Sequence, residues 1–137
     1  MTEPEIFEKL KPLLVAALGV TPEKIRMESA LVTDLGAESI DLLDLSFQIE
    51  DKFGVTIEGN EMEKEARTRM SGGAYEKDGL LTEEALAEIR GAARGLDPAK
   101  LVKGLRKADL PSLLTVAFFV HLIARKLADK AEGVVHA

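Results

Sequence analysis

The chain has 137 residues, a length that suits one modest domain and hardly allows two. Hydrophobic residues make up 46% of it and charged residues 31%, so we expect a packed, soluble domain rather than a disordered chain. The net charge of −6 argues against nucleic acid as a partner, because phosphate contacts need clusters of Lys and Arg. The absence of cysteine excludes disulfides, Cys-ligated metals and a catalytic thiol.

The N-terminal stretch "MTEPEIFEKL" is acidic and lacks the apolar core of a signal peptide, so we expect a cytoplasmic protein. The longest uncharged run, residues 110–124, contains a proline and a histidine. It is shorter than the roughly 20 residues that a membrane-spanning helix needs. We therefore expect a buried helix there and no transmembrane segment.

The first expected helix covers residues 3–18, where apolar side chains recur at helical spacing. Thr2 and Glu5 have the spacing of a capping box, and Gly19 is a typical helix stop. Pro12 predicts a kink or a split in the middle of this helix.

A one-turn helix at "TPEK" and a long loop precede a second helix at residues 39–53, which ends at Gly54. A weaker apolar stripe, Met62, Ala66 and Met70, indicates a third helix. The glycine-rich stretch at residues 71–79 is the clearest break in the chain.

Two amphipathic helices are expected after the break, at residues 82–93 and 97–107. The last helix, residues 112–130, is apolar on nearly every side over its first turns. It must therefore be covered on more than one face. Together these patterns predict an all-α bundle.

Ser39 stands between two carboxylates at the start of the second helix, and a helix N-cap is its simplest interpretation. Leu42 occupies the position where a capping box would have Glu or Gln. Gly36 would allow a backbone or a ligand to approach closely. These features leave room for a second interpretation, in which the hydroxyl is modified.

The charge around Ser39 has one sign. Residues 34–63 contain nine acidic residues and one basic residue, Lys52. A solvated helix face is the ordinary interpretation of a charge run, but such faces usually mix signs. A face of one sign indicates a docking surface for basic proteins.

The segment "DLGAESIDLLDLSFQIEDKFGVTIE", residues 34–58, resembles the signature of the acyl carrier proteins, whose usual core is Asp-Ser-Leu after an Asp-Leu-Gly-Ala lead. The resemblance extends to "EIFEKLKPLLVAALGVTPEKI" before it and to "LPSLLTVAFFVHLIARKL" near the end of the chain. Glu38 and Ile40 stand where Asp and Leu are usual, and both changes keep charge or apolar character.

The resemblance implies that Ser39 carries a 4′-phosphopantetheine arm, taken from coenzyme A, whose thiol holds acyl groups as thioesters. A helix N-terminus suits such a phosphodiester, since its free N–H groups and dipole favour an anion. The implied partners are a phosphopantetheinyl transferase and acyl-transferring or condensing enzymes with basic docking surfaces. The expected cofactor-binding residues beside Ser39 are Asp34, Gly36, Glu38 and Ile40. The expected docking residues are Asp41, Asp44, Glu50 and Asp51, and the expected acyl-pocket residues are Leu42, Leu45, Ile49, Phe118 and Phe119.

Ile40, Leu43 and Phe47 would face a partner or the acyl pocket, with core packing as an equal alternative. The two histidines, His121 and His136, have no partners in the sequence for a catalytic triad or a metal site. We therefore expect a carrier rather than an enzyme.

The family's fold implies a four-helix bundle, here enlarged by a helical insertion at residues 63–108 within a single domain, 1–137. The insertion could cover the outer face of the last helix, and we favour this account. It could instead enlarge the interior for a long acyl chain, or support dimerisation. We expect a monomer rather than a dimer. The expected function is to hold acyl groups as thioesters and present them to enzymes of fatty acid or lipid biosynthesis, including lipid A or long chains. A carrier of an amino acid or polyketide unit, or an unmodified interaction module, is the alternative.

Overall fold

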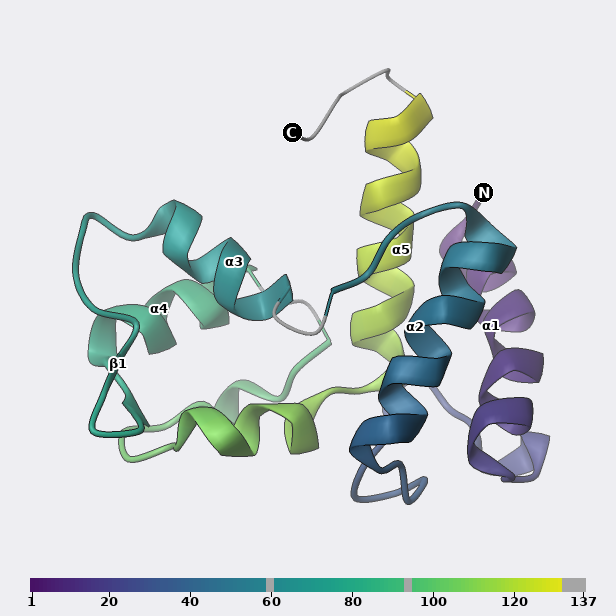
Figure 1. Cartoon of the computed structure of the whole chain (residues 1–137), viewed down its shortest axis with the longest axis horizontal. Helices are drawn as coiled ribbons and strands as arrows, with labels where there is room; N and C mark the ends of the chain where they lie inside the picture. The colour runs from purple at the N-terminus through teal and green to yellow at the C-terminus, as the bar shows by residue number, and fades with distance from the viewer. Residues whose placement is uncertain (59–60, 93–94, 132–137) are drawn as a thin grey trace.

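The structure, a computed structural model, describes residues 1–58, 61–92 and 95–131, with the side chain of residue 92 excepted. These residues are mostly helical (Figure 1). The α-helices are α1 (Glu3–Leu18), α2 (Ser39–Phe53), α3 (Glu61–Arg69), α4 (Glu83–Ala92) and α5 (Val116–Ala131). Three 3-10 helices, η1 (Pro22–Lys24), η2 (Pro98–Lys100) and η3 (Lys107–Leu113), and two strands, β1 (Glu76–Lys77) and β2 (Leu80–Leu81), complete the elements.

Helix α1 begins and ends where its caps predict. The Thr2 hydroxyl accepts a hydrogen bond from the backbone N–H of Glu5, and the Glu5 carboxylate accepts one from the N–H of Thr2, each at 3.3 Å. Gly19 ends the helix in the left-handed conformation, with φ of 68°. Pro12 lies inside the helix, which continues through it, so of the expected kink or split the split does not occur.

Helices α1, α2 and α5 lie side by side and enclose the first hydrophobic core (Figure 1). Their inward-facing side chains follow the helical spacing expected from the sequence. Burial of each such large side chain stabilises the fold by about 1.5–3 kcal/mol. The central members of this core are Ile6, Leu10, Leu14, Leu45, Ile49, Val120 and Ile123.

A second hydrophobic core lies on the other side of α5, among α3, α4, the strands and η3 (Figure 1). Its central members are Ala66, Tyr75, Leu86, Ile89 and Leu101. Leu114 and Phe118 pack against both cores, so the start of α5 joins them.

The all-α prediction is corrected in one place, because β1 and β2 form a short antiparallel hairpin. Glu76 pairs with Leu81 and Lys77 with Leu80. The turn between them uses two left-handed residues, Asp78 (φ 55°) and Gly79 (φ 82°). The glycine-rich break at residues 71–79 thus contains the turn of a hairpin.

Two expected helices differ from the structure. Within residues 97–107 only η2 and the first residue of η3 are helical, and the backbone of Leu105 instead accepts a hydrogen bond from the N–H of Leu81. Helix α5 begins at Val116 rather than residue 112, since η3 and an extended Leu114 precede it. Helix α4 agrees with the expected 82–93, although residue 93 lies outside the described residues.

No helix among the described residues is long and apolar enough to cross a membrane. The apolar run that ends at residue 124 instead contributes η3 and the first half of α5, which the two cores cover.

Candidate functional site

Ser39 is the first residue of α2 and does not cap it. The cap position is Glu38, whose backbone is extended (φ −102°, ψ 169°). Its N–H donates a hydrogen bond of 2.9 Å to the Asp41 carboxylate. The Ser39 hydroxyl is exposed and makes no hydrogen bond within the part of the chain that the structure describes. The N-cap interpretation of Ser39 is therefore wrong, and the hydroxyl has no structural task in the fold.

The loop before Ser39 is held by its own backbone and by Asp34. The Asp34 carboxylate accepts a hydrogen bond from the N–H of Ala30 at 2.8 Å, which closes the turn that leads to α2. Gly36 has φ of 73°, and a Cβ there would meet no protein atom within 4 Å. Glycine is thus favoured by backbone conformation, not by close approach of another part of the protein.

This loop is also tied to the start of α5, a connection that the sequence does not predict. The N–H of Leu31 donates to the carbonyl of Leu114 at 3.0 Å, and the N–H of Val116 donates to the carbonyl of Ser29 at 2.9 Å. The segment that positions Ser39 is therefore anchored on the helix that joins the two cores.

Three apolar side chains of α2 face solvent beside Ser39. Ile40 is 70% exposed, Leu43 56% and Phe47 60%, and their spacing puts them on one face of the helix. The alternative that they pack in the core is wrong.

Of the expected docking residues, Asp44, Glu50 and Asp51 are exposed, and Asp41 is half-buried.

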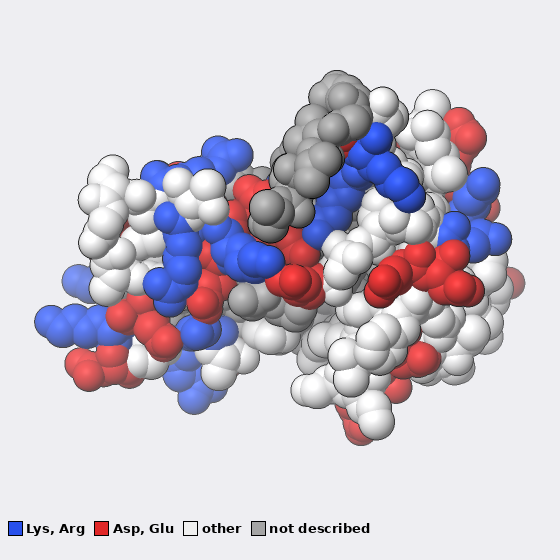
Figure 2. Space-filling view, turned by 45° about the horizontal axis from the view of Figure 1, so that its top comes forward, with Lys and Arg blue, Asp and Glu red and all other residues white. Residues whose placement is uncertain are grey.

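The visible face of the molecule carries many Lys and Arg side chains over the part that contains α3, α4 and the hairpin (Figure 2). Several cations of this part of the chain are paired with acidic neighbours. Arg67 bonds to Glu63 at 3.1 Å, and Lys107 contacts Glu63 at 2.8 Å and Glu76 at 3.3 Å. The hydrogen bond from Lys107 lowers the pKa of the Glu63 carboxyl.

A cleft of about 540 Å³ lies between α2 and the segment from α3 to η3. Ser39 lines it, together with Leu43 and Phe47 of α2, and most of its surface is apolar. The opposite wall includes Met62 of α3 and Leu110 of η3. A modified Ser39 would thus carry its group at the wall of an apolar cleft of a size typical of small-molecule sites.

Only some of the expected acyl-pocket residues line this cleft. Leu42, Phe118 and Phe119 line it. Leu45 and Ile49 do not, because they are fully buried in the first core.

Tyr75 also lines the cleft and was not singled out from the sequence. Its side chain is 1% exposed, and its hydroxyl has no hydrogen-bond partner among the described residues. Burial raises the pKa of Tyr75 to about 12. The guanidinium of Arg67 and the ammonium of Lys107 lie 5.2 and 5.9 Å from the centre of its ring.

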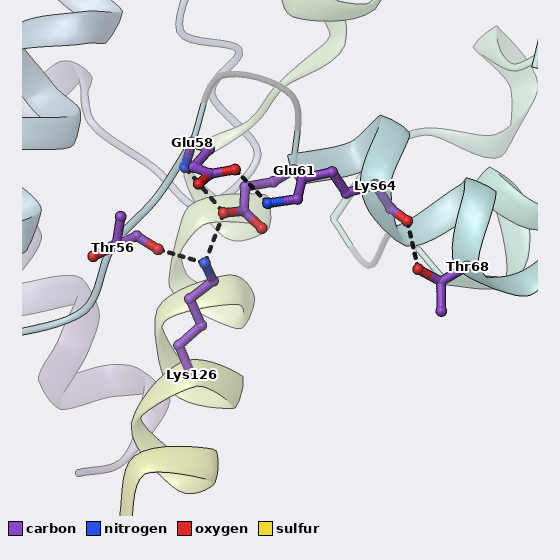
Figure 3. A network of polar contacts seen from close by, with 6 residues as sticks. All are labelled: Thr56, Glu58, Glu61, Lys64, Thr68 and Lys126. Atoms are coloured by element: carbon purple, nitrogen blue, oxygen red, sulfur yellow. Dashed lines mark hydrogen bonds and ion pairs between the residues drawn. The ribbon is translucent and has the colours of Figure 1, made fainter. Parts of the chain in front are cut away.

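A network of polar contacts closes one end of this region (Figure 3). The ammonium of Lys126 on α5 contacts the carboxylate of Glu61 on α3 at 2.7 Å and also donates to the carbonyl of Thr56. Glu58 is paired with Lys64, and this hydrogen bond lowers the pKa of the Glu58 carboxyl. The network links α5, α3 and the chain that leaves α2.

His121 takes no part in this site. The Nδ1 atom of His121 on α5 lies 2.6 Å from the carboxylate of Glu3 on α1, which joins two helices of the first core. His136 lies outside the described residues. Across residues 1–58, 61–92 and 95–131, no three His, Cys, Asp or Glu side chains are grouped so that they could hold a metal ion.

Comparisons with known proteins agree with this geometry. Residues 8–68 match the family model described as "Phosphopantetheine attachment site". The chain is 42% identical over 64 residues to the acyl carrier protein of Petrotoga mobilis. The matched stretch covers 47% of this chain and 75% of the relative. The chain is also 42% identical over 60 residues to the acyl carrier protein of Thermotoga maritima (44% and 74%) and 43% identical over 59 residues to that of Wolinella succinogenes (43% and 78%).

These matches confirm the resemblance seen in the sequence, including its phosphopantetheine cofactor. The family implies a phosphopantetheinyl transferase and acyl-handling enzymes as partners, and its members carry acyl groups without catalysing reactions themselves. The chain belongs to the acyl carrier protein family.

Proposed function

We propose that Ser39 is the residue that carries the 4′-phosphopantetheine arm. The observation that carries this proposal is the exposed hydroxyl of Ser39, which engages no other described group and lies at the wall of the cleft. At the first position of α2, an attached phosphodiester would face free backbone N–H groups and the positive end of the helix dipole. Glu38 and Ile40 flank the arm, while Asp34 and Gly36 shape the loop that leads to it.

The acyl chain held by the arm would lie in the cleft. Leu42 of α2 and Phe118 and Phe119 of α5 would contact it, and Met62 and Leu110 would contact it from the other wall. An apolar lining favours burial of a chain of methylene groups, each worth about 0.8 kcal/mol when buried. This chemistry favours fatty acyl cargo over an amino acid, whose charged amino group would be desolvated in such a cleft.

Partner enzymes would dock on α2. Its exposed carboxylates, Asp44, Glu50 and Asp51, offer negative charge, with Asp41 beside them, and Ile40 offers an apolar contact next to the arm. Basic surfaces on a phosphopantetheinyl transferase and on acyl-transferring or condensing enzymes would complement this face. We propose that this carrier serves fatty acid or lipid synthesis in the cytoplasm, with long-chain lipids, lipid A among them, as candidate products.

We propose further that residues 63–108 are an insertion within a single domain, 1–137. The family match ends at residue 68, and α3 spans the proposed boundary at Glu63. The remainder of this segment would have two roles. It covers the start of α5, in line with the favoured account, and it contributes Glu63, Tyr75 and Lys107 to the lining of the cleft, in line with the account of a larger interior.

The attachment proposal is tested by the intact mass of the protein after incubation with coenzyme A and a phosphopantetheinyl transferase. The unsubstituted protein and Ser46→Ala should each gain one phosphopantetheinyl group, and Ser39→Ala should gain none. Ser46 is the matched control, because it lies on the same helix and lines the same cleft, but its hydroxyl donates to the carbonyl of Leu42 at 3.0 Å. A mass gain in Ser39→Ala would disprove the assignment.

A further inference from the structure

Thr115 directly precedes α5 and lies between two parts of the chain. On one side its backbone forms an isolated antiparallel bridge with Ala30, in the loop of residues 29–38 that leads to Ser39 (the attachment loop). Backbone hydrogen bonds of 2.9 and 3.0 Å flank this bridge. On the other side the Thr115 hydroxyl donates to the carbonyl of Gly95 at 2.5 Å. Thr115 thus joins the attachment loop to the segment between α4 and η2.

The hydrogen bonds of the attachment loop continue from this bridge toward Ser39. The N–H of Ala37 donates to the carbonyl of Leu31 at 2.9 Å, and one residue separates Ala37 from Ser39. The Asp34 carboxylate accepts from the N–H of Ala30 at 2.8 Å and closes the turn between them. Leu31 and Ala37 are both buried, so the loop cannot shift without breaking these contacts. The position of the Ser39 hydroxyl therefore depends on how the attachment loop pairs with the start of α5.

The Thr115 hydroxyl has a second bond besides the one that caps α5. It accepts a hydrogen bond from the N–H of Phe118 at 3.1 Å, as an N-cap residue does. A carboxylate would serve this purpose equally well, because the cap needs only an acceptor. The bond to Gly95 needs a donor in addition, which a hydroxyl supplies and a carboxylate does not. A hydroxyl at this position therefore suits a link between two parts of the chain as well as a helix cap.

We propose that Thr115 is a positioning residue for the attachment of the arm. Its hydroxyl lets the segment between α4 and η2 hold the attachment loop, and with it Ser39, in the geometry that the transfer requires. The inference rests on the proposed function, since it takes Ser39 as the modified residue.

The transfer itself makes strict demands on the position of the Ser39 oxygen. This oxygen forms a bond to the phosphorus that bears the pantetheine of coenzyme A. The bond from that phosphorus to the adenosine bisphosphate breaks, and the hydroxyl proton passes to a base of the transferase. A misplacement of the attacking atom by about 1 Å can lower the rate about a hundredfold.

Loss of this positioning and loss of overall stability affect the transfer differently. The transferase would dock on the carboxylates of α2, which remain in place, so a displaced Ser39 lowers kcat and leaves KM unchanged. Partial unfolding instead lowers the concentration of carrier that can bind, which raises the apparent KM and leaves kcat at saturation unchanged. The two kinetic constants therefore separate positioning from stability.

The test measures kcat and KM of a phosphopantetheinyl transferase for variants of the carrier, with intact mass as the readout. Thr115→Val removes both hydrogen bonds of the hydroxyl. Thr115→Asp keeps an acceptor for the N–H of Phe118 and removes only the donor to Gly95. Thr115→Ser keeps the donor and the acceptor.

Thr82 supplies matched controls, because its hydroxyl makes the same two kinds of bond at the start of another helix. It directly precedes α4, donates to the carbonyl of Ala74 at 2.6 Å and accepts from the N–H of Ala85 at 3.1 Å. Thr82→Val and Thr82→Asp therefore make the same chemical changes beside the second core rather than beside the attachment loop.

We expect Thr115→Val and Thr115→Asp to lower kcat about tenfold with KM unchanged, and Thr115→Ser to keep the kcat of the unsubstituted protein. Amide hydrogen exchange at Leu31 and Ala37 should become faster in the first two variants, because the attachment loop opens more often. Thr82→Val should lower the midpoint of thermal unfolding as Thr115→Val does, but leave kcat and the exchange at these two amides unchanged.

The inference is overturned if Thr115→Asp keeps the kcat of the unsubstituted protein or if its loss appears in KM alone. It is also overturned if the Thr82 variants lower kcat equally, or if Thr115→Ser does not keep it. If Thr115→Val fails to fold, Thr115→Asp decides, because it keeps the helix cap. If the transferase adds no group to the unsubstituted protein, it is the proposed function that fails, and the mass reveals this before any variant is compared.

Discussion

Two serines of α2 differ in whether the fold engages their hydroxyl groups. The Ser46 hydroxyl donates to the carbonyl of Leu42, one turn earlier in the helix. The Ser39 hydroxyl sits at the first helical position, where Asp41 already serves the cap by accepting from the N–H of Glu38. Ser39 can therefore be substituted or modified without loss of a hydrogen bond, which is the property that an attachment residue needs.

Tyr75 is the only tyrosine of the chain, and the chain has no tryptophan, so its ionisation can be followed directly. Burial raises its pKa from 10.0 to about 12 in the folded protein. The phenolate absorbance should therefore rise with a midpoint near pH 12 in the native protein and near pH 10 in concentrated urea.

The same shift has a consequence for stability. Below pH 10 both the folded and the unfolded chain keep the phenolic proton, and Tyr75 has no effect on the pH dependence. Between pH 10 and 12 the unfolded chain loses its proton first, so the free energy of unfolding falls as the pH rises. Tyr75→Phe should lack this contribution. A native midpoint near pH 10 would show that the phenol is solvated and would contradict the buried site.

At the scale of elements, the contact between Gly95 and the first turn of α5 fastens the segment between α4 and η2 to α5. Gly95 has φ of 91°, and a Cβ there would lie 2.5 Å from the backbone nitrogen of Phe118. Its carbonyl accepts a hydrogen bond from the hydroxyl of Thr115, which in turn accepts from the N–H of Phe118. The close approach depends on the missing side chain.

Gly95→Ala should lower the free energy of unfolding by about 2–4 kcal/mol, since it combines a strained left-handed residue with a clash against backbone. Urea unfolding followed by circular dichroism measures this change. Gly91→Ala is the matched control. Gly91 is exposed within α4, a Cβ there would meet nothing within 4 Å, and alanine favours helix by about 1 kcal/mol. Equal effects of the two substitutions would show that the contact at Gly95 is unimportant.

Elements whose ends depend on neighbouring residues could be predicted from the sequence. The bounds of α1 and α2 agree with the structure because Thr2, Gly19 and Gly54 act within one turn of the helix ends. The start of α5 and residues 97–107 were predicted incorrectly for a different reason. Their backbone groups bond to distant segments, Leu114 to Leu31 and Leu105 to Leu81, and no local pattern reveals such partners.

At the scale of the whole molecule, two hydrophobic cores share the start of α5 and are linked again by ion pairs farther along that helix. Lys126 contacts Glu61, and Arg125 contacts Glu65, both on α3. Glu61 is half-buried, and its carboxylate also accepts from the N–H of Glu58 at 3.0 Å. These contacts hold α3 against α5 at the end of the cleft.

Lys126→Met should loosen this link, because it leaves the Glu61 carboxylate without its cation, at a cost of about 1–2 kcal/mol. Amide hydrogen exchange should become faster in α3 and stay unchanged in α1. Lys130→Met is the control, since Lys130 lies one turn later on α5 and bonds to the carbonyl of Gly54 rather than to α3. Exchange in α3 that matches the unsubstituted protein would contradict a role of Lys126 in holding α3 against α5.

The sequence reveals one wall of the candidate site but not the other. Ser39, Leu42 and the exposed stripe of α2 lie in the segment with the family's signature, so their place could be anticipated. Tyr75 comes from a segment without a known pattern, and it meets Met62 and Leu110 only because the second core folds against α5. A single tyrosine in the glycine-rich stretch at residues 71–79 is unusual enough to draw attention to Tyr75, but no neighbouring residue indicates that its side chain is buried.

The most direct test of the account is to locate the arm on the chain. Trypsin cleavage after Arg26 and Lys52 releases residues 27–52, a peptide that contains Ser29, Ser39 and Ser46. After incubation with coenzyme A and a phosphopantetheinyl transferase, fragmentation of this peptide in the mass spectrometer assigns the added group to one residue. The account predicts the phosphopantetheinyl group on Ser39. A group on Ser29 or Ser46, a group in another peptide, or an unmodified chain would contradict it.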